Sequence, residues 1–442
     1  MLFGQSFAVL GSSLTNFGVS VQVLLDYADS DIQTTLYTMT LLASTLPAVL
    51  MGPFVGSLVD RWPRKLTLIC AQLGAAICTL VIALMYWTDN FSIAGLLWVL
   101  PFSSLFALGL QVGFAASVVL IVPKEKLSRA SGSLGMMMGL IQISGPLLAG
   151  ILMDQIGLEM IFVINLITFA IGLATLFVIT IPNPERESKG KITFVALLGD
   201  LKEAYEYMKG KPGLLGSLFL FALILFNVSS AQALFAPLVL SLGTATDLGL
   251  VRMFAGVGMV IGGLAMVIWK GPKRKMPVIL SVTVFASVAL MVMPVTQKIW
   301  LICAGAFMIM SIIPLASTSS QVLWQHKIDP AFHGRVFSLR GTMLKAMQPI
   351  AFLVTGVLAD AFFKPGMAEG QSLANIFGSV WGVGEPRGIA LMMSALGVFS
   401  FVLVMIAFFI PAIRRVDINL PDVNVKKQTV IEKPIAANPD SL

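Results

Sequence analysis

The sequence predicts an all-α membrane protein with twelve transmembrane helices in two pseudo-symmetric six-helix bundles. Of its 442 residues, 57% are hydrophobic and only 12% are charged, whereas a soluble domain carries roughly 25% charged residues. Apolar runs of about 20 residues, the length needed to cross the hydrocarbon core of a bilayer, recur along the whole chain. The short alternating segments of a membrane β-barrel are absent.

Twelve apolar runs are long enough to span the membrane, and a long polar interruption follows the sixth. The expected spans are 2–25, 34–59, 66–87, 94–121, 130–153, 157–181, 213–239, 246–269, 276–294, 298–324, 337–363 and 387–411. The first span begins almost at Met1, so the usual short cytoplasmic leader is expected to be missing. We expect four parts: an N-terminal bundle (1–181), a cytoplasmic linker (182–212), a C-terminal bundle (213–411) and a cytoplasmic tail (412–442).

The distribution of basic residues predicts the orientation. Of the 29 Lys and Arg residues, 23 fall in the loops and tail on the side of the two termini, 3 fall in the loops on the other side, and 3 lie within spans. Since cytoplasmic loops are enriched in Lys and Arg, both termini are expected in the cytoplasm of a bacterial cell, with the protein in its plasma (inner) membrane. The net charge of +7 is therefore a topology signal and does not indicate a nucleic-acid partner.

The linker and the tail have distinct patterns. Apolar side chains recur at helical spacing in the linker, at Leu197, Leu198, Leu201, Tyr205 and Met208, opposite a charged face. This pattern predicts an amphipathic helix along the inner membrane surface, either a packing strut between the bundles or a regulatory element. The tail after Arg415 is polar and is expected to be mostly disordered.

Motifs of enzymes, cofactors and metal sites are absent from the sequence. There is no G-x-S-x-G elbow and no phosphate-binding G-x-x-x-x-G-K motif. The two histidines, His326 and His333, flank a loop that offers no other metal ligands. We therefore expect no enzyme activity, no cofactor and no metal. Without an ATP-binding motif, uphill transport would need a coupling ion.

A glycine, a carboxylate and a basic cluster end the second span, in the order Gly56, Asp60, Arg61, Arg64 and Lys65. Gly56 and Asp60 are four residues apart and share one helical face. A glycine on such a face lets a neighbouring helix approach closely. We expect these five residues to form a conformational gate at the cytoplasmic end.

The same Gly-x-x-x-Asp spacing recurs at two other helix ends. The fifth span ends with Gly150 and Asp154, and the eleventh with Gly356 and Asp360. Positions two and five match as inverted repeats, and five and eleven match as parallel repeats between the two halves. We expect these pairs to be equivalent helix ends of an internally repeated fold.

The pattern from Gly56 to Lys65 resembles the signature loop of the major facilitator superfamily. Further segments are similar to its macrolide-efflux and enterobactin-exporter branch: Gly11–Phe17, Val59–Trp62, Val122–Lys126, Ser319–Trp324, Gly334–Phe337 and the glycine-rich outer segment 364–388. Pro63 replaces the glycine usual in the signature loop. The resemblance implies a monomer with twelve helices, alternating access and proton-driven efflux.

In that superfamily, spans one, four, seven and ten line the central cavity. Side-chain amides concentrate in these spans here, and one arginine lies in the eighth; together they give the expected substrate cavity, Asn16, Gln22, Gln111, Asn227, Gln232, Gln321 and Arg252. Each amide could instead join helices, and Arg252 could instead snorkel to the surface. No carboxylate lies in the middle of a span, so no coupling residue stands out.

The combined expectation is a lipid-embedded exporter of hydrophobic or amphiphilic small molecules, such as a macrolide, siderophore or peptide metabolite, coupled to protons. Two alternatives remain open on the residues: an importer of the same fold, and a non-transporting membrane protein that binds a ligand or biosynthetic partner. Efflux that an uncoupler abolishes would favour the exporter, whereas binding without flux would favour the last alternative.

Overall fold

The computed structural model describes residues 2–121, 124–179, 194–269, 274–329 and 332–420, and within these ranges helices are the only regular elements. Eleven helices are long and apolar enough to cross a membrane. One of them, α5 (Lys124–Val178), contains two of the expected spans, which join at Gly157, where the backbone turns to φ 73°. The described residues therefore confirm twelve spans.

The first half of the chain forms one group of helices. After α1 (Leu2–Asp26), α2 (Gln33–Arg61), α3 (Arg64–Trp87) and α4 (Ile93–Ile121), the group closes with the double-length α5. The main packing pairs are α1 with α5, α2 with α4, and α3 with both α4 and α5.

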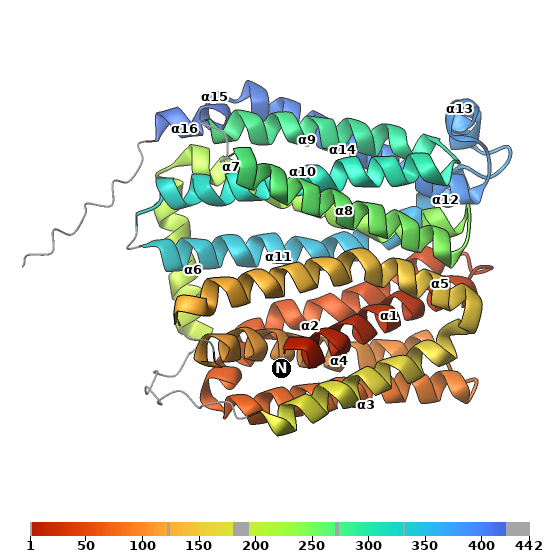
Figure 1. Cartoon of the computed structure of the whole chain (residues 1–442). Coiled ribbons are helices and arrows are strands. Elements are labelled where there is room, and N and C mark those ends of the chain that lie inside the picture. The colour runs from red at the N-terminus through yellow and green to blue at the C-terminus, as the bar shows by residue number, and fades with distance from the viewer. Residues whose placement is uncertain (1, 122–123, 180–193, 270–273, 330–331, 421–442) are drawn as a thin grey trace, which may run out of the picture.

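The second half repeats this organisation. Its long helices are α7 (Pro212–Leu240), α8 (Ala245–Trp269), α9 (Lys275–Val292), α10 (Ile299–Lys327), α11 (His333–Leu358) and α14 (Glu385–Phe409). A π-helical stretch, η3 (Ala359–Phe363), continues α11, and the short helices α12 (Lys364–Gly366) and α13 (Ser372–Trp381) follow. Figure 1 shows the long helices side by side, with α6 at one end of the bundle and α13 at the other. We call these the linker end and the far end.

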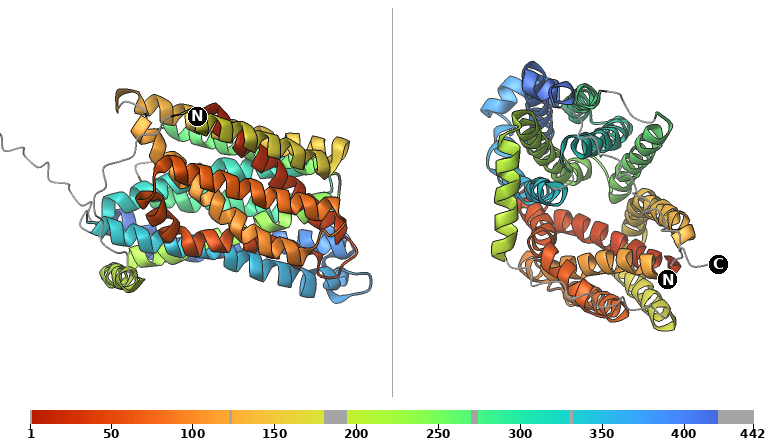
Figure 2. Two further views of the ribbon diagram at one scale, coloured as in Figure 1. Left: turned by 90° about the horizontal axis from the view of Figure 1, so that it is seen from below. Right: turned by 90° about the vertical axis from the view of Figure 1, so that its left-hand side faces the viewer.

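The two halves lie against each other along two helix pairs, α5 with α8 and α2 with α11. Seen along the bundle from the linker end, the red-to-yellow first half and the green-to-blue second half are separate groups (Figure 2, right). Helix α6 (Phe194–Lys209) runs along the side of both groups.

The contacts of α6 are with the second half, chiefly with α11. The Tyr207 ring stacks on Phe332 at 4.4 Å between centroids, and Glu203 pairs with Arg335 at 2.8 Å. Met208 is buried, whereas Tyr205, expected on the same apolar face, is exposed, since the face that contacts α11 passes through Met208 and not through Tyr205. The side chains of Leu197 and Leu198 lie outside the described part.

The first residues of the tail form two short helices. Helices α15 (Pro411–Arg414) and α16 (Val416–Asn419) pack on the second half, and Val416 is fully buried. The Asp417 carboxylate accepts the N–H of Met276 at 2.7 Å, and Lys327 donates to the carbonyl oxygen of Asp417 at 2.7 Å. These polar contacts hold the first residues of the tail against the second half. Residues 421–442 lie outside the described part.

Candidate functional site

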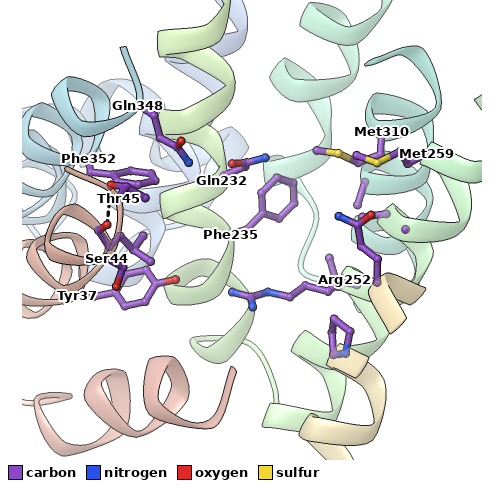
Figure 3. A pocket seen from close by; sticks show the side chains of 17 residues that line it. Tyr37, Ser44, Thr45, Gln232, Phe235, Arg252, Met259, Met310, Gln348 and Phe352 are labelled. Atoms are coloured by element: carbon purple, nitrogen blue, oxygen red, sulfur yellow. Dashed lines mark hydrogen bonds between the residues drawn. The ribbon is translucent and has the colours of Figure 1, made fainter. Parts of the chain in front are cut away.

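A cavity of about 420 Å³ lies between the two halves, within the range of small-molecule sites. We call it the central cavity. Side chains from α2, α5, α7, α8, α10 and α11 line it, and Figure 3 shows polar and apolar side chains mixed around it. The polar lining consists of Tyr37, Ser44, Thr45, Gln142, Gln232, Arg252 and Gln348, and the bulky apolar lining includes Phe235, Met259, Met310 and Phe352.

A second cavity of about 530 Å³ lies mainly within the first half, and we call it the first-half cavity. It shares Leu41, Ser44, Pro146 and Arg252 with the central cavity, so the two adjoin. Its wall is rich in hydroxyl and amide groups, which come from Ser12, Ser13, Thr15, Asn16, Ser20, Thr40, Ser44, Thr79, Ser103 and Asn165. Both walls are mainly apolar, and the first-half cavity has the larger share of hydrogen-bonding groups.

Arg252 lies where the two cavities join. Its guanidinium group stands 5.1 Å from the centre of the Phe17 ring and interacts with the hydroxyl of Tyr37. Figure 3 shows the Arg252 and Tyr37 side chains pointing toward one another across the central cavity. The arginine therefore points inward, and does not snorkel to a membrane surface.

The predicted cavity residues divide into three groups. Asn16 lines the first-half cavity, Gln232 lines the central cavity, and Arg252 lines both. Asn227 borders a small cavity of about 80 Å³ inside the second half, where its amide donates to the carbonyl oxygen of Leu396 at 2.7 Å. This hydrogen bond joins α7 to α14. Asn227 therefore follows the alternative role that the sequence left open for each amide, which is to join two helices.

The other three predicted amides line neither of the two cavities. Gln22 donates to Asp26 one turn along α1, at 2.6 Å. Gln321 accepts a hydrogen bond from Arg340 at 2.8 Å. Gln111 is exposed on α4. The prediction used only the span in which each amide lies. Whether an amide lines a cavity depends also on the face of the helix that carries it.

Two cavity amides come from spans that sequence reasoning did not consider. Gln142 on α5 and Gln348 on α11 both line the central cavity. They are separated by 206 residues, the same offset that relates Gly150 to Gly356 and Asp154 to Asp360. The repeat could have identified this pair from sequence. Tyr37 also lines the central cavity and was not predicted. It lies two turns before Ser44 in an otherwise apolar helix, so the sequence places both polar side chains on one helical face.

The predicted helix ends on α5 and α11 meet across the two halves at the far end. Asp360 accepts the backbone N–H of Thr35 at 2.6 Å, and Asp154 accepts that of Thr246 at 2.8 Å. Thr35 lies in the first turn of α2 and Thr246 in the first turn of α8. We call these two hydrogen bonds the far-end contacts. Asp360 also pairs with Lys364 at 3.1 Å, and both of these side chains are buried.

Helix geometry explains why carboxylates occupy these places. The first N–H groups of a helix have no partner within the helix, and the helix dipole makes that end partly positive. A carboxylate from the other half accepts a hydrogen bond from one of these N–H groups, and its negative charge is attracted to the partly positive helix end. Gly150 and Gly356 allow the close approach, because an added Cβ would overlap the backbone of α8 at Gly150 and the Thr38 hydroxyl at Gly356.

The contact between α5 and α8 loosens from the far end toward the linker end. At Gly150 an added Cβ would overlap α8, and at Gly249 it would lie 2.6 Å from a backbone oxygen of α5. At Gly256 the nearest atom of α5 would be a backbone oxygen at 3.2 Å, and at Gly139 the nearest atom of α8 would be a side-chain carbon of Val260 at 3.9 Å. At Gly135 no described atom lies within 4 Å. The halves therefore meet closely at the far end and diverge toward the linker end.

The expected gate at the end of α2 is only partly described. Arg64 is buried and donates to the carbonyl oxygen of Val59, and Lys65 donates to that of Phe177 at 2.9 Å. Arg61 is exposed. These contacts stay within the first half. The side chain of Asp60 lies outside the described part.

The close helix approach expected at Gly56 is not found among the described atoms. None of them lies within 4 Å of a Cβ added there. The divergence of the halves at this end gives the physical reason, because within the described ranges no helix of the second half reaches this face of α2.

Comparison with known proteins identifies the family. The model of the Major Facilitator Superfamily matches residues 1–352. The chain belongs to the major facilitator superfamily. Members of this superfamily are transporters and not enzymes, as the sequence predicted. The described residues of this superfamily member contain no group of three or more His, Cys, Asp or Glu side chains that could hold a metal ion.

Curated relatives within the superfamily include proteins named for macrolide efflux and for multidrug resistance. The chain is 25% identical to Macrolide efflux protein A of Streptococcus pyogenes over 330 residues, which cover 73% of this chain and 80% of that protein. It is 26% identical to the Enterococcus faecalis protein of the same name, covering 69% and 95%. Multidrug resistance protein MdtG of Proteus mirabilis is 26% identical, with coverage of 74% and 77%.

Solved superfamily structures share the fold. The nucleoside transporter NupG superposes with a TM-score of 0.64 at 13% identity, covering 92% of this chain and 100% of that one. A bacterial homologue of the iron transporter ferroportin, in an inward-facing state, gives a TM-score of 0.62 at 17% identity, covering 91% and 96%. This likeness confirms the twelve-helix fold.

Proposed function

We propose that this superfamily member is a monomeric exporter of hydrophobic or amphiphilic small molecules in the bacterial plasma membrane. Cargo binds in the central cavity between the two halves, and the halves rock to expose it to one side at a time. The observation that carries this proposal is a cavity of mixed polar and apolar lining, enclosed by helices from both halves. A movement of one half against the other necessarily changes such a cavity.

The interface between the halves supports alternating access. Charge-assisted hydrogen bonds hold the far end together, while α5 and α8 separate toward the linker end. In the other state of the cycle, the linker end would close and the far-end contacts would break. Backbone hydrogen bonds to two carboxylates suit this role because they form or break without rearranging the helices.

The basic residues support a cytoplasmic linker end with both termini inside. In that orientation the conformation described here is open to the cytoplasm, where an exporter collects its cargo. The two relatives named Macrolide efflux protein A support efflux as the direction of transport.

Coupling to protons requires a carboxylate that changes its protonation state during the cycle. Among the described residues, Asp360 is the buried acidic side chain, and it lies at the contact between the two halves. Its location therefore supports Asp360 as the coupling residue.

Efflux from cells that express the protein tests the proposal. Cells preloaded with a fluorescent hydrophobic dye or with a radiolabelled macrolide should lose it faster than control cells, and an uncoupler should abolish the difference. Faster accumulation would favour the importer. Binding by the purified protein without flux in either direction would favour the non-transporting alternative.

A further inference from the structure

Arg252 is the one charged side chain among the described residues that line the central and first-half cavities. It is the eighth residue of α8, about 10 Å along the helix axis from its first residue at about 1.5 Å per residue. A cation at that depth carries a large desolvation cost, and such residues in membrane proteins mark substrate or ion sites.

The neighbours of Arg252 stabilise it only in part. The Phe17 ring attracts a cation through its π-electrons, and the Tyr37 hydroxyl offers a polar oxygen. Neither side chain carries a negative charge at neutral pH, and no carboxylate lines either cavity within the described residues. An arginine whose counter-charge the protein does not supply is suited to take it from a bound anion.

The side chains on either side of Arg252 indicate which other chemical groups a bound ligand would carry. Toward the second half lie the rings of Phe235 and Phe352 and the thioethers of Met259 and Met310, an adaptable apolar surface. Toward the first half lie the hydroxyl and amide groups of the first-half cavity. The Tyr37 hydroxyl can donate a second hydrogen bond to a group that Arg252 holds, since Figure 3 shows both pointing into the same space.

We propose that this transporter selects amphiphilic anions. A carboxylate, or a similar singly charged acidic group, binds Arg252 and Tyr37. The apolar body of the molecule lies against the phenylalanine and methionine side chains of the central cavity, and hydroxyl substituents reach into the first-half cavity. This assignment rests on the proposed transport function and adds the charge of the cargo, which the names of the relatives do not state.

The test uses three fluorescent probes with the same dansyl body and octyl chain, ending in a carboxylate, a neutral amide or an ammonium group. Binding is measured by fluorescence polarisation with the full-length protein in lipid nanodiscs, and transport is measured in proteoliposomes. The variants are Arg252→Gln, Arg252→Lys and Arg252→Glu. The matched control is Lys298→Gln, which removes an exposed basic residue outside both cavities.

Wild type should bind the carboxylate probe most tightly. Arg252→Gln should weaken carboxylate binding roughly tenfold or more, the effect of losing one charge-assisted hydrogen bond. Binding of the amide probe should change less than about twofold, because that probe makes no such bond. Arg252→Lys should retain part of the preference, Arg252→Glu should shift it to the ammonium probe, and Lys298→Gln should match wild type.

Two results would overturn the assignment while leaving the proposed function intact. One is wild-type transport that favours the ammonium probe or does not distinguish the three. The other is an equal loss of all three probes in Arg252→Gln at unchanged protein amount, which would make Arg252 a structural residue. If wild type neither binds nor transports any probe, the proposed function fails and this assignment fails with it.

Discussion

The carboxylate of Asp360 accepts the backbone N–H of Thr35 at 2.6 Å, across 325 residues of sequence. This hydrogen bond joins η3, which continues α11, to the first turn of α2, and Asp154 makes the equivalent bond to α8. The two bonds differ in their surroundings, since Asp360 is buried and paired with Lys364, whereas Asp154 is exposed. The proposed two-state cycle therefore depends more strongly on Asp360.

Asp360→Asn should open the far end. Losing a charge-assisted hydrogen bond should destabilise the far-end-closed state by about 1–3 kcal/mol. That corresponds to a shift of roughly five- to a hundredfold in the ratio of the two states. A single cysteine at Ser44, which lines both cavities, should react faster with an impermeant maleimide added outside the cell. The background lacks Cys70, Cys78 and Cys303.

Two further variants control this experiment. Asp154→Asn makes the same chemical change at the exposed contact and should have a smaller effect, because exposed ionic contacts contribute less. The double variant Asp360→Asn with Lys364→Met removes the buried lysine that the single change would leave without its partner, and it should keep the increased reactivity. Unchanged or slower labelling in both Asp360 variants would show that this carboxylate does not hold the far end closed.

Glycine-to-valine changes at the two ends should have opposite effects. Gly150→Val places a side chain into the backbone of α8, so it should disfavour the conformation described here. Gly135→Val adds a side chain where no described atom lies within 4 Å, so it should be tolerated here and should hinder closure of the linker end. Over-packing typically costs about 1–3 kcal/mol.

The same cysteine at Ser44 reports both glycine variants. Gly150→Val should raise its labelling from outside intact cells, and Gly135→Val should raise its labelling in inside-out vesicles. Both should transport more slowly than wild type. Labelling changes in the same direction for both variants would rule out a rocking movement about the cavity.

Asp60→Asn should act in the opposite sense to Asp360→Asn. If Asp60 holds the linker end closed in the outward-open state, its loss should shift the equilibrium toward the conformation described here, by roughly five- to a hundredfold. Transport should fall strongly while cargo affinity in the inward-open state changes little. Maleimide labelling of the Ser44 cysteine should rise in inside-out vesicles. Normal transport by Asp60→Asn would show that Asp60 does not hold the linker end closed.

Site-directed labelling should establish the orientation. Cysteines at Asp89 or Lys298 should react with an impermeant maleimide in intact cells, because both lie at the far end on loops poor in basic residues. Cysteines at Lys202 or Lys209, exposed on α6, should react only after the membrane is opened. The reverse pattern would invert the topology, and with it the side to which the cavity opens here.

The sequence by itself determined the membrane-spanning helices, because the signal for each is local. A run of about 20 apolar residues needs no partner to be recognised, and the observed helix ends differ from the predicted ones by only a few residues. The internal repeat was visible for the same reason, as spacing along the chain.

Only the tertiary structure decided what each polar residue in those helices meets. Gln22 and Gln232 look alike in sequence, yet Gln22 bonds to its own helix, whereas Gln232 lines the central cavity. Successive residues of a helix point in directions about 100° apart, so each meets different neighbours. Which direction leads to a cavity depends on how the twelve helices pack. The repeat offset relating Gln142 to Gln348 was in the sequence, but the convergence of the two side chains on one cavity was not.

The contacts of Asp154 and Asp360 show the same division. Their Gly-x-x-x-Asp spacing predicted equivalent helix ends, and the structure supplies their partners, the unpaired N–H groups at the starts of α8 and α2. Backbone N–H groups carry no signature in the sequence, because every residue except proline has one. Which of them reach a carboxylate is fixed by how closely the two halves approach, and that is a property of the assembled fold.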